Sequence, residues 1–360
     1  MKLVRSAGIL ALLVALLAPV ASVSADYIPI YVHPGESIQA AINKAPAGGI
    51  VVVERGTYKG NLDIKRSVRL LGHDAVIVPA AKATKNLCST LLSAVEGICV
   101  HGVVNADFTV GAPVSNVSIE GFTVRKFSGA GMVVAGAKGF RAARDVMAQN
   151  GAWGIMTFSS SDVSLLYNSS HDNGNSGIEV DTTPSANAVI VGNSSYGNVG
   201  MGIAFADALG GRIELNAVYG NCAGILVSAS ADPRSTGGGD VSIQLNQVTA
   251  NNHLCPAVPN GMAAYGGFGI VLIGARNSTV ALNDVRDNVS QIGSSIPGGG
   301  ILLLDGALFG VAAPSGPTGD SIRLNWLSGN TPNDIYGDGT GTTNTISGNS
   351  CTITNLTGAC

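Results

Sequence analysis

A repeated pair of asparagines, Asn-x4-Asn, constrains the fold of this chain more than any other feature. Six copies are present, and an earlier unit over residues 145–150 has Asp in the first place. The copies span residues 168–173, 193–198, 216–221, 246–251, 283–288 and 325–330. Gly and an apolar alternation follow each unit, as in Gly154-Ile155, and the first four steps from Gly131 to Gly224 span 23, 23, 25 and 22 residues. A repeat of this length, with one supersecondary unit per copy, predicts a solenoid.

Each repeat contains three short runs of alternating hydrophobicity, which is the pattern of half-buried strands. One run begins at the Gly-Ile step, a second is exemplified by residues 163–166, and a third follows the first Asn of the pair. Three strands of about 3–5 residues with their turns fill a coil of this length. Asn suits a column at a tight turn, because it tolerates left-handed backbone and its amide both donates and accepts. The sequence therefore predicts an all-β protein built from stacked coils.

The repeat resembles that of the right-handed parallel β-helix proteins, the pectate-lyase-like superfold, over the whole chain after residue 25. The resemblance implies a single-domain solenoid of about ten coils over residues 26–360. Residues 33–42 have the pattern of an amphipathic helix capped by Ser37. In the family this helix covers the open end of the coil stack. We expect an N-terminal cap over about residues 33–60 and a C-terminal cap over about residues 344–360.

The first 25 residues have the pattern of a signal peptide. Lys2 and Arg5 precede an apolar run, and Val23-Ser24-Ala25 is a small-residue cleavage site. The run is shorter than the ~20 residues that span a bilayer, so we expect secretion (extracellular or periplasmic) and no membrane insertion. Charged residues make up only 12% of the chain, the pI is near 5.9, and no basic run is present, which argues against nucleic-acid binding. A monomer is expected.

The six cysteines all follow the cleavage site, and an even number in an oxidising compartment indicates disulfides. No Cys/His spacing typical of zinc is present. The six are Cys88, Cys99, Cys222, Cys255, Cys351 and Cys360, and fifteen pairings are possible in principle. Cys222 and Cys255 follow the second Asn of adjacent repeats, so we predict a bridge between them at one corner of neighbouring coils.

Three carboxylates are the candidate catalytic or metal-binding residues. The resemblance places the Gly-Ile run in the first strand of each coil, whose outer face forms the floor of a carbohydrate groove. Glu179 then points outward, Asp181 lies two residues further along, and Asp207 lies in almost the same place one coil later. We expect them to gather within roughly 5–8 Å. They would suit calcium, or an acid–base pair for glycoside cleavage. Alternatively, the aspartates cap turns and Glu179 is a solvated outward residue.

Five further residues are candidate substrate contacts, namely His171, Tyr196, Tyr219, Arg212 and Asp305. His171, Tyr196 and Tyr219 share one column, and such a ladder of rings can stack on sugar faces or on itself. The uronate lyases of this fold use a Lys or Arg base, and because no Lys follows Lys138, only an arginine such as Arg212 could take this role.

Four insertions interrupt the repeat. They could form the walls of a cleft over the C-terminal half of the solenoid, with Asp305 at the edge of the cleft. They span residues 228–240, 252–268, 289–299 and 305–320. Alternatively, the insertions are surface loops without a binding function, since loops tolerate insertions.

The resemblance implies a secreted carbohydrate-active protein that acts on an extracellular polysaccharide, as a lyase or a glycoside hydrolase, with calcium or no cofactor. The alternative is a non-catalytic carbohydrate-binding or structural protein of the surface or matrix. An accessory role in metal maturation is a third possibility, which no soft ligand cluster supports. The Asp-Pro-His motif of the epimerases and the paired Asp signature of the polygalacturonase-like hydrolases are both absent, so the sequence leaves the reaction open.

Overall fold

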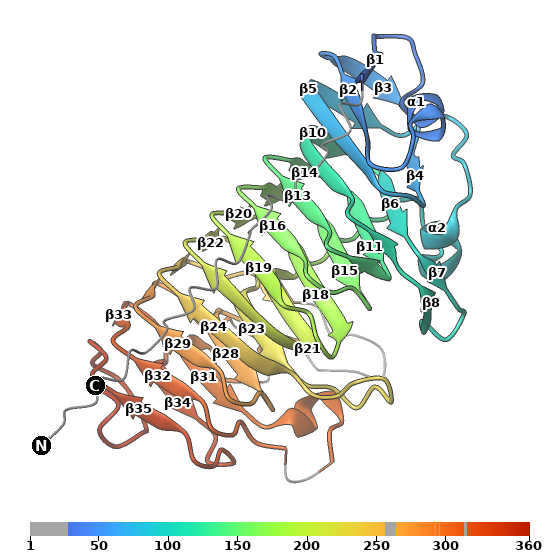
Figure 1. The fold of residues 1–360 in the computed structure, drawn as a ribbon. Coiled ribbons are helices and arrows are strands. Elements are labelled where there is room, and N and C mark those ends of the chain that lie inside the picture. The colour runs from blue at the N-terminus through green and yellow to red at the C-terminus, as the bar shows by residue number, and fades with distance from the viewer. Residues whose placement is uncertain (1–27, 256–263, 292, 295, 313–314) are drawn as a thin grey trace, which may run out of the picture.

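The computed structural model describes residues 28–255, 264–291, 293, 294, 296–312 and 315–360. The predicted signal peptide at residues 1–25 lies outside these residues. The described chain winds as a stack of coils from the N-terminal end to the C-terminal end, and each regular coil contributes one strand to each of three parallel sheets (Figure 1). The prediction of an all-β parallel solenoid is confirmed.

The first sheet contains the strands that begin at the Gly-Ile steps. Its ten strands, each paired in parallel with the next, agree with the prediction of about ten coils. They are β4 (Leu62–Ile64), β6 (Ile98–His101), β11 (Met132–Ala135), β15 (Ile155–Phe158), β18 (Ile178–Thr183), the first part of β21 (Met201–Glu214), β23 (Ala223–Ser228), β28 (Phe268–Ile273), β31 (Gly299–Leu304) and β34 (Asn333–Gly337).

The second sheet follows the first along each coil. Its strands are β1 (Ile30–Val32), β2 (Gly49–Val53), the first parts of β5 (Val68–Val78) and β10 (Ser118–Arg125), β13 (Arg141–Ala143), β16 (Ser164–Leu166), β19 (Ala188–Val191), the second part of β21, β24 (Gly239–Gln244), β29 (Thr279–Ala281), β32 (Ser321–Arg323) and β35 (Thr345–Ser347).

The third sheet completes each coil. Its strands are β3 (Gly56–Lys59), the second parts of β5 and β10, β14 (Val146–Ala148), β17 (Ser169–His171), β20 (Ser194–Tyr196), β22 (Ala217–Tyr219), β25 (Gln247–Thr249), β30 (Asp284–Arg286) and β33 (Trp326–Ser328).

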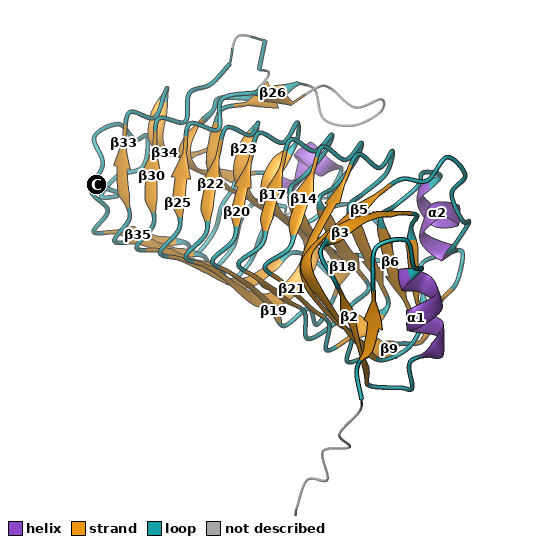
Figure 2. Ribbon diagram, turned by 90° about the horizontal axis from the view of Figure 1, so that it is seen from above, coloured by secondary structure: helices purple, strands orange, loops and turns teal. Residues whose placement is uncertain are grey.

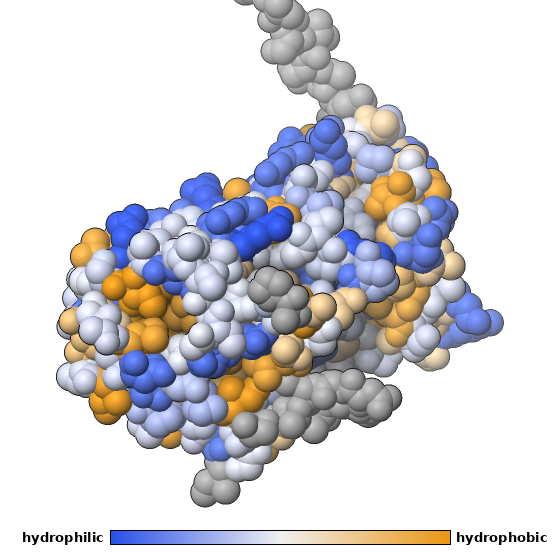
Figure 3. All heavy atoms as spheres, turned by 90° about the horizontal axis from the view of Figure 1, so that it is seen from below, coloured by the Kyte–Doolittle hydropathy of each residue, from blue (hydrophilic) through white to orange (hydrophobic). Residues whose placement is uncertain are grey.

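The core fills the inside of the coils. The inward residues of the first sheet, such as Ile155, Ile178, Ile203 and Ile225, have no exposed surface. Because side chains alternate between the two faces of a strand, their neighbours point to the outer face of the sheet. In a view from below, hydrophobic side chains on the surface form separate patches among hydrophilic ones (Figure 3).

Short helices and pairs of short strands lie outside the three main sheets. Helix α1 (Ile38–Lys44) lies at the N-terminal end of the stack (Figure 2), and the Ser37 hydroxyl accepts a 3.2 Å hydrogen bond from the Ala40 amide, so the predicted capping helix is present. The other elements are α2 (Leu87–Leu92), the 3-10 helix η1 (Gly306–Phe309), and the pairs β7 (Val103–Val104) with β8 (Val110–Ala112), β9 (Val114–Ser115) with β12 (Ala137–Lys138), and β26 (Leu254–Cys255) with β27 (Tyr265–Gly266). Among the described helices, none is long and apolar enough to cross a membrane.

The repeated asparagines form two buried ladders at the corners on either side of the third sheet. Asn216 is representative: its Nδ2 donates to Oδ1 of Asn246 and to the Ile190 carbonyl, both at 2.9 Å, and its Oδ1 accepts from the amide groups of Asn193. The first ladder contains residues 168, 193, 216, 246, 283, 325 and 349, and the second contains residues 150, 173, 198, 221, 251, 288 and 330. Each side chain thus satisfies backbone groups that the tight turn would leave unpaired.

The residue with left-handed backbone is not the ladder asparagine but the residue before it. Tyr167, Leu215 and Leu245, for example, have φ angles of 57°. Of the two properties that favour Asn in such a column, tolerance of left-handed backbone is therefore not used by the ladder residues themselves. Asn is needed in these columns because its amide hydrogen bonds along the stack, and its tolerance of left-handed backbone has no part in this.

Three disulfides are present: Cys88–Cys99, Cys222–Cys255 and Cys351–Cys360. Cys222 and Cys255 have Cα atoms 5.2 Å apart, within the range for a bridge, as predicted from their position in adjacent repeats.

Candidate functional site

In the part of the chain that the structure describes, apolar clusters cover the outer face of the first sheet at both ends but not at β18 (Ile178–Thr183). At its N-terminal end, α2 and the β7–β8 hairpin cover Cys99, Val133, Met156 and Phe158 with an apolar cluster that includes Leu91. At its C-terminal end, a second apolar cluster buries Leu226, Val271 and Leu302 beneath side chains from two of the insertions, namely Cys255, Tyr265 and Ile296. Strand β18 lies between the two clusters, so its outward side chains form the floor of the uncovered part.

Those outward side chains are Glu179 and Asp181. They point to the same face because they lie two residues apart on β18, with Cα atoms roughly 6–7 Å apart by the rise of a strand. Both are half-buried. Oε2 of Glu179 accepts a 2.7 Å hydrogen bond from the indole Nε1 of Trp153, and Oδ1 of Asp181 accepts a 2.7 Å bond from the Thr182 hydroxyl. We refer to Glu179 and Asp181 as the carboxylate pair.

The carboxylate pair is shifted toward the protonated state. Burial, and then the nearby charge of Asp181, raise the pKa of Glu179 to about 7 against the hydrogen bonds from Ser176 and Trp153. Burial also raises the pKa of Asp181 to about 6, with a further upward contribution from Asp207. The hydroxyl of Thr182 and the charge of Arg234 act in the opposite direction. Two neighbouring carboxyl groups with different raised pKa values can serve as an acid and a base near neutral pH.

Asp207 has a different role from the carboxylate pair. It is buried, and its carboxylate accepts hydrogen bonds from the Ser230 amide at 2.6 Å and from the hydroxyls of Ser230 and Ser235 at 2.5 Å each. Both of its oxygens therefore have donors, and they hold the insertion at residues 228–240 against the first sheet. Asp207 remains close enough to raise the pKa of Asp181.

The three carboxylates are a poor fit to calcium. Calcium takes six to eight oxygen ligands, whereas the oxygens of Asp207 already accept from serine donors and Oε2 of Glu179 accepts from Trp153. Across the part of the chain that the structure describes, the one set of three acidic, His or Cys residues whose ligand atoms lie within 4.8 Å of one another is Asp63, Cys99 and His101. Calcium therefore has no role in the chemistry proposed for the carboxylate pair.

A cleft of about 460 Å³ borders the carboxylate pair. Its lining includes Thr182 and Thr183, which follow Asp181, together with Phe108, Lys138 and Arg234. The Arg234 guanidinium stacks over the Phe108 ring at 4.6 Å and pairs with Asp232. The cleft thus combines a mostly apolar lining with hydroxyls and two cations, and it reaches the carboxylate pair through Thr182, the residue that follows Asp181, while neither carboxylate lines it.

The column of rings lies on another side of the solenoid. His171, Tyr196 and Tyr219 stand on β17, β20 and β22 of the third sheet and stack on one another, with centroids 4.7 and 4.9 Å apart and nearly parallel planes. The facing sides of these rings are therefore occupied by each other.

Arg212 and Asp305 also lie apart from the carboxylate pair. Arg212 belongs to the part of β21 in the second sheet and pairs with Glu214 at 3.0 Å. Asp305 follows β31 and caps η1, accepting hydrogen bonds from the Ala307 amide and the Ser315 hydroxyl. The candidate substrate contacts thus occupy three different sheets, and they do not converge on one groove.

Sequence reasoning missed several residues around the carboxylate pair. Trp153 immediately precedes a Gly-Ile step and is in register with Ser176 and Met201 of the following coils. This register could be read from the repeat, whereas the contact of the Trp153 indole with Glu179 depends on the turn before the strand. Phe108 and Tyr265 had no such signal. They come from segments outside the repeat, and their positions depend on how those segments fold back onto the sheet.

The comparisons with known proteins concern the fold. Residues 89–248 match the family model described as the right handed beta helix region. The chain is similar to the A-module of the Azotobacter vinelandii mannuronan C-5 epimerase AlgE4, with 19% identity, a TM-score of 0.55, and coverage of 89% of this chain and 93% of that one. The chain is also similar to the A-module of the mannuronan C-5 epimerase AlgE6 from the same organism, with 18% identity, a TM-score of 0.54, and coverage of 89% of this chain and 91% of that one.

An alginate lyase from Paenibacillus sp. str. FPU-7 is also similar, with 14% identity, a TM-score of 0.51, and coverage of 87% of this chain and 99% of that one. No curated protein matches the chain in sequence. Together with the three parallel sheets and the asparagine ladders, these likenesses lead to one conclusion. The chain has the fold of the right-handed parallel β-helix proteins.

Proposed function

We propose that this protein acts on a polysaccharide at the uncovered part of the first sheet, with the carboxylate pair as acid and base. The observation that carries the proposal is the pair itself: two adjacent outward carboxyl groups whose pKa values are raised to about 7 and about 6, beside a cleft that contains two cations. A solvated surface pair without function would keep ordinary pKa values near 4.

The proposed roles follow from the two pKa values. Near neutral pH, Glu179 retains its proton in a large fraction of molecules and can protonate a glycosidic oxygen, while Asp181 is mostly ionised and can accept a proton. Lys138 and Arg234 are placed to bind an anionic or polyhydroxylated sugar in the cleft. The same pair could serve hydrolysis, in which a water attacks the sugar, or elimination, in which the base removes a carbon-bound proton.

The similar structures support the choice of substrate class. Two are by name mannuronan C-5 epimerases and one is an alginate lyase, so their substrates are polysaccharides. The three disulfides support secretion, as the N-terminal sequence predicts.

A second candidate function is carbohydrate binding without chemistry. It is favoured by one observation: apolar clusters cover the outer face on both sides of β18, so only a short stretch of floor is open to a chain. Such a protein would use the same cleft and the edges of the ring column as contacts. The two candidates differ in whether the carboxylate pair is needed for turnover or only for affinity.

The deciding experiment is a panel of neutral and uronate polysaccharides incubated with the mature protein. Reducing ends report hydrolysis, absorbance of unsaturated products reports elimination, and NMR of the polymer reports epimerisation. Glu179→Gln and Asp181→Asn should each abolish activity with the fold intact. Glu214→Gln is the matched control, since Glu214 is half-buried on the second sheet and pairs with Arg212.

Full activity in Glu179→Gln would contradict the assignment of the carboxylate pair. Polysaccharide binding without turnover, measured by affinity electrophoresis across the same panel, would leave the binding function as the better description.

A further inference from the structure

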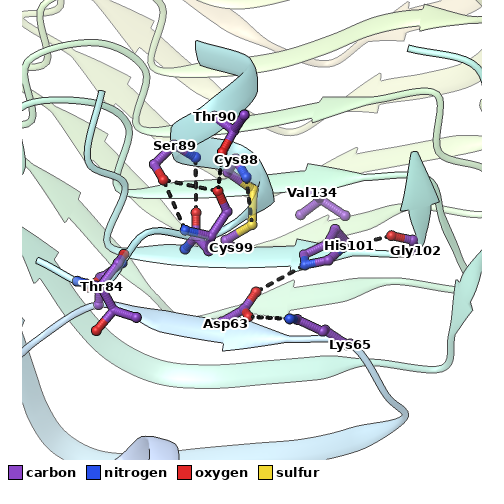
Figure 4. Close-up of a disulfide and its surroundings, with 12 residues drawn as sticks. Asp63, Lys65, Thr84, Cys88, Ser89, Thr90, Cys99, His101, Gly102 and Val134 are labelled. Carbon is purple, nitrogen blue, oxygen red and sulfur yellow. Dashed lines mark hydrogen bonds and ion pairs between the residues drawn. A yellow bond between two sulfur atoms is a disulfide. The ribbon is translucent and has the colours of Figure 1, made fainter. Parts of the chain in front are cut away.

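A cluster of four potential metal ligands lies at the N-terminal end of the first sheet, remote from the carboxylate pair. Asp63 of β4 and Cys99 and His101 of β6 bring one ligand atom each within 4.8 Å of one another. Cys88 of α2 is bonded to Cys99, so its sulfur joins the same cluster (Figure 4). Both cysteines are fully buried, while the side chains of His101 and Asp63 are 11% and 20% exposed.

The hydrogen bonds around the cluster orient His101 as they do in metal sites. Its Nδ1 lies 2.7 Å from the Gly102 carbonyl, and its Nε2 faces Oδ1 of Asp63 at 3.0 Å (Figure 4). Metal-binding histidines usually donate one ring N–H to a carbonyl or carboxylate and bind through the other nitrogen. The second oxygen of Asp63 accepts from the Lys65 ammonium at 2.9 Å, which fixes the carboxylate.

The ligand set and its spacing suit zinc. Zinc is bound tetrahedrally by thiolate, imidazole and carboxylate groups at about 2.0–2.3 Å, which places neighbouring ligand atoms about 3.3–3.8 Å apart. The ligand atoms of Asp63, Cys99 and His101 need to move little to reach that arrangement, since they lie within 4.8 Å of one another, and the Cys88 sulfur is bonded to that of Cys99. The disulfide is what prevents it, because a bonded sulfur is not a thiolate.

We propose that reduction of the Cys88–Cys99 disulfide creates a zinc site with Cys88, Cys99, His101 and Asp63 as its four ligands. A thiol reductant supplies two equivalents: each protein sulfur gains one electron and one proton, and the two reductant sulfurs join as a disulfide. Zinc then displaces the two thiol protons, and Nε2 of His101 binds in its deprotonated form. The cationic side chain of Lys65 beside the cluster favours the thiolates.

An access path to the site is present. Asp63 and Lys65 line a cleft of about 650 Å³ below α1, so a metal ion can approach the carboxylate from solvent. Metal binding and the disulfide are mutually exclusive, because both use the same two sulfurs. The cluster would therefore hold zinc in a reduced chain and release it on oxidation.

The test compares oxidised and reduced full-length mature protein. The disulfides are reduced with a water-soluble phosphine, which becomes its phosphine oxide with oxygen from water while the two sulfurs each gain a proton. Protein is then incubated with zinc, desalted, and analysed for metal by mass spectrometry. The expected result is one zinc per reduced chain and none in the oxidised chain. Cobalt in place of zinc should give a thiolate-to-metal charge-transfer band and the visible bands of a tetrahedral site.

Amino-acid substitutions test which residues bind the zinc ion. Cys88→Ser with Cys99→Ser should lose the metal, and His101→Gln should lower the affinity by more than the 10- to 100-fold typical of a supporting residue such as Lys65. A four-serine variant that combines Cys222→Ser, Cys255→Ser, Cys351→Ser and Cys360→Ser should still bind one zinc, which excludes the other two disulfides as the source of the ligands. Absence of metal from this reduced four-serine variant when circular dichroism shows it folded, or binding that survives Cys88→Ser with Cys99→Ser, would overturn the proposal.

Discussion

Oδ1 of Asn168 accepts a 3.0 Å hydrogen bond from the backbone amide of Asp145, so Asp145 takes the place of an asparagine in the first ladder. Its own Oδ1 accepts from the Phe122 amide at 2.9 Å, as a ladder asparagine would. Its second oxygen, which stands where an amide nitrogen would donate, is buried and has no hydrogen-bond partner. Burial raises the pKa of Asp145 to about 7.

Asp145→Asn should stabilise the protein above neutral pH. The folded pKa of about 7 exceeds the unfolded value of about 3.9, so ionisation destabilises the fold progressively from about pH 4 and fully above pH 7. Asparagine cannot ionise, and it supplies the missing donor. We expect a gain of about 1–3 kcal/mol at pH 8 and little change at pH 4, measured by urea unfolding. Equal gains at both pH values would show that Asp145 is not the ionising group.

Asn216→Ala should destabilise the solenoid by about 1–3 kcal/mol, because it leaves the amides of Asn193 and the acceptors of its own Nδ2 unpaired. The control is Asn43→Ala, an exposed residue of α1, for which we expect a change below about 0.5 kcal/mol. Chemical unfolding followed by circular dichroism measures both. An unchanged midpoint in Asn216→Ala would mean that the ladder does not contribute to stability.

Activity on a polysaccharide should follow a bell-shaped pH curve. The acid limb should reflect ionisation of Asp181 near pH 6, and the alkaline limb the loss of the proton of Glu179 near pH 7. Because these groups interact, the two limbs report on the pair together. Asp181→Asn removes a negative charge that raises the pKa of Glu179, so the pKa of Glu179 should be lower in this variant than in the unchanged protein, as measured by NMR titration of its carboxyl carbon. A flat profile between pH 5 and 8 would contradict acid–base catalysis by this pair.

Removal of calcium should leave the thermal midpoint unchanged. The oxygens of Asp207 are held by Ser230 and Ser235, so the three carboxylates do not offer calcium a ligand set. Differential scanning calorimetry with and without a chelator measures this. A midpoint that falls on chelation and recovers with added calcium would reveal a site, since a ligand that binds only the folded state stabilises it.

The coil architecture could be predicted because every coil repeats the same constraints. The Gly-Ile step fixes which strand residues point inward, so the burial of Ile155 and the outward direction of Glu179 followed from the sequence register. In the same way, the Asn pairs define the positions of the two corners on either side of the third sheet in each coil. The position of the left-handed residue was missed because tolerance of left-handed backbone is only one reason to select Asn, and hydrogen bonding along the stack is the other.

The surroundings of the carboxylate pair could be predicted only in part. Trp153 lies within the repeat, and its column is defined by the sequence. Arg234 and Tyr265 lie in the insertions at residues 228–240 and 252–268, whose course over the sheet is set by tertiary contacts such as the serine bonds to Asp207 and the Cys222–Cys255 bridge. The prediction that Asp207 lies near the other two carboxylates agrees with its effect on the pKa of Asp181. Its bonds to Ser230 and Ser235 depend on the anchoring of a loop, which no repeat register can reveal.

The second asparagine ladder also has an electrical direction. Each amide carbonyl points to the coil before it and each amide nitrogen to the coil after it, so the side-chain dipoles add along the solenoid axis, as peptide dipoles do in a helix. The ladder ends at Asn330, whose Nδ2 donates to Asp334 at 3.0 Å. Burial would raise the pKa of Asp334, but this bond and those from Thr352 and Ile353 outweigh it and lower the pKa. A buried anion thus terminates the positive end of the stacked dipoles, as an acidic residue does at the start of an α-helix.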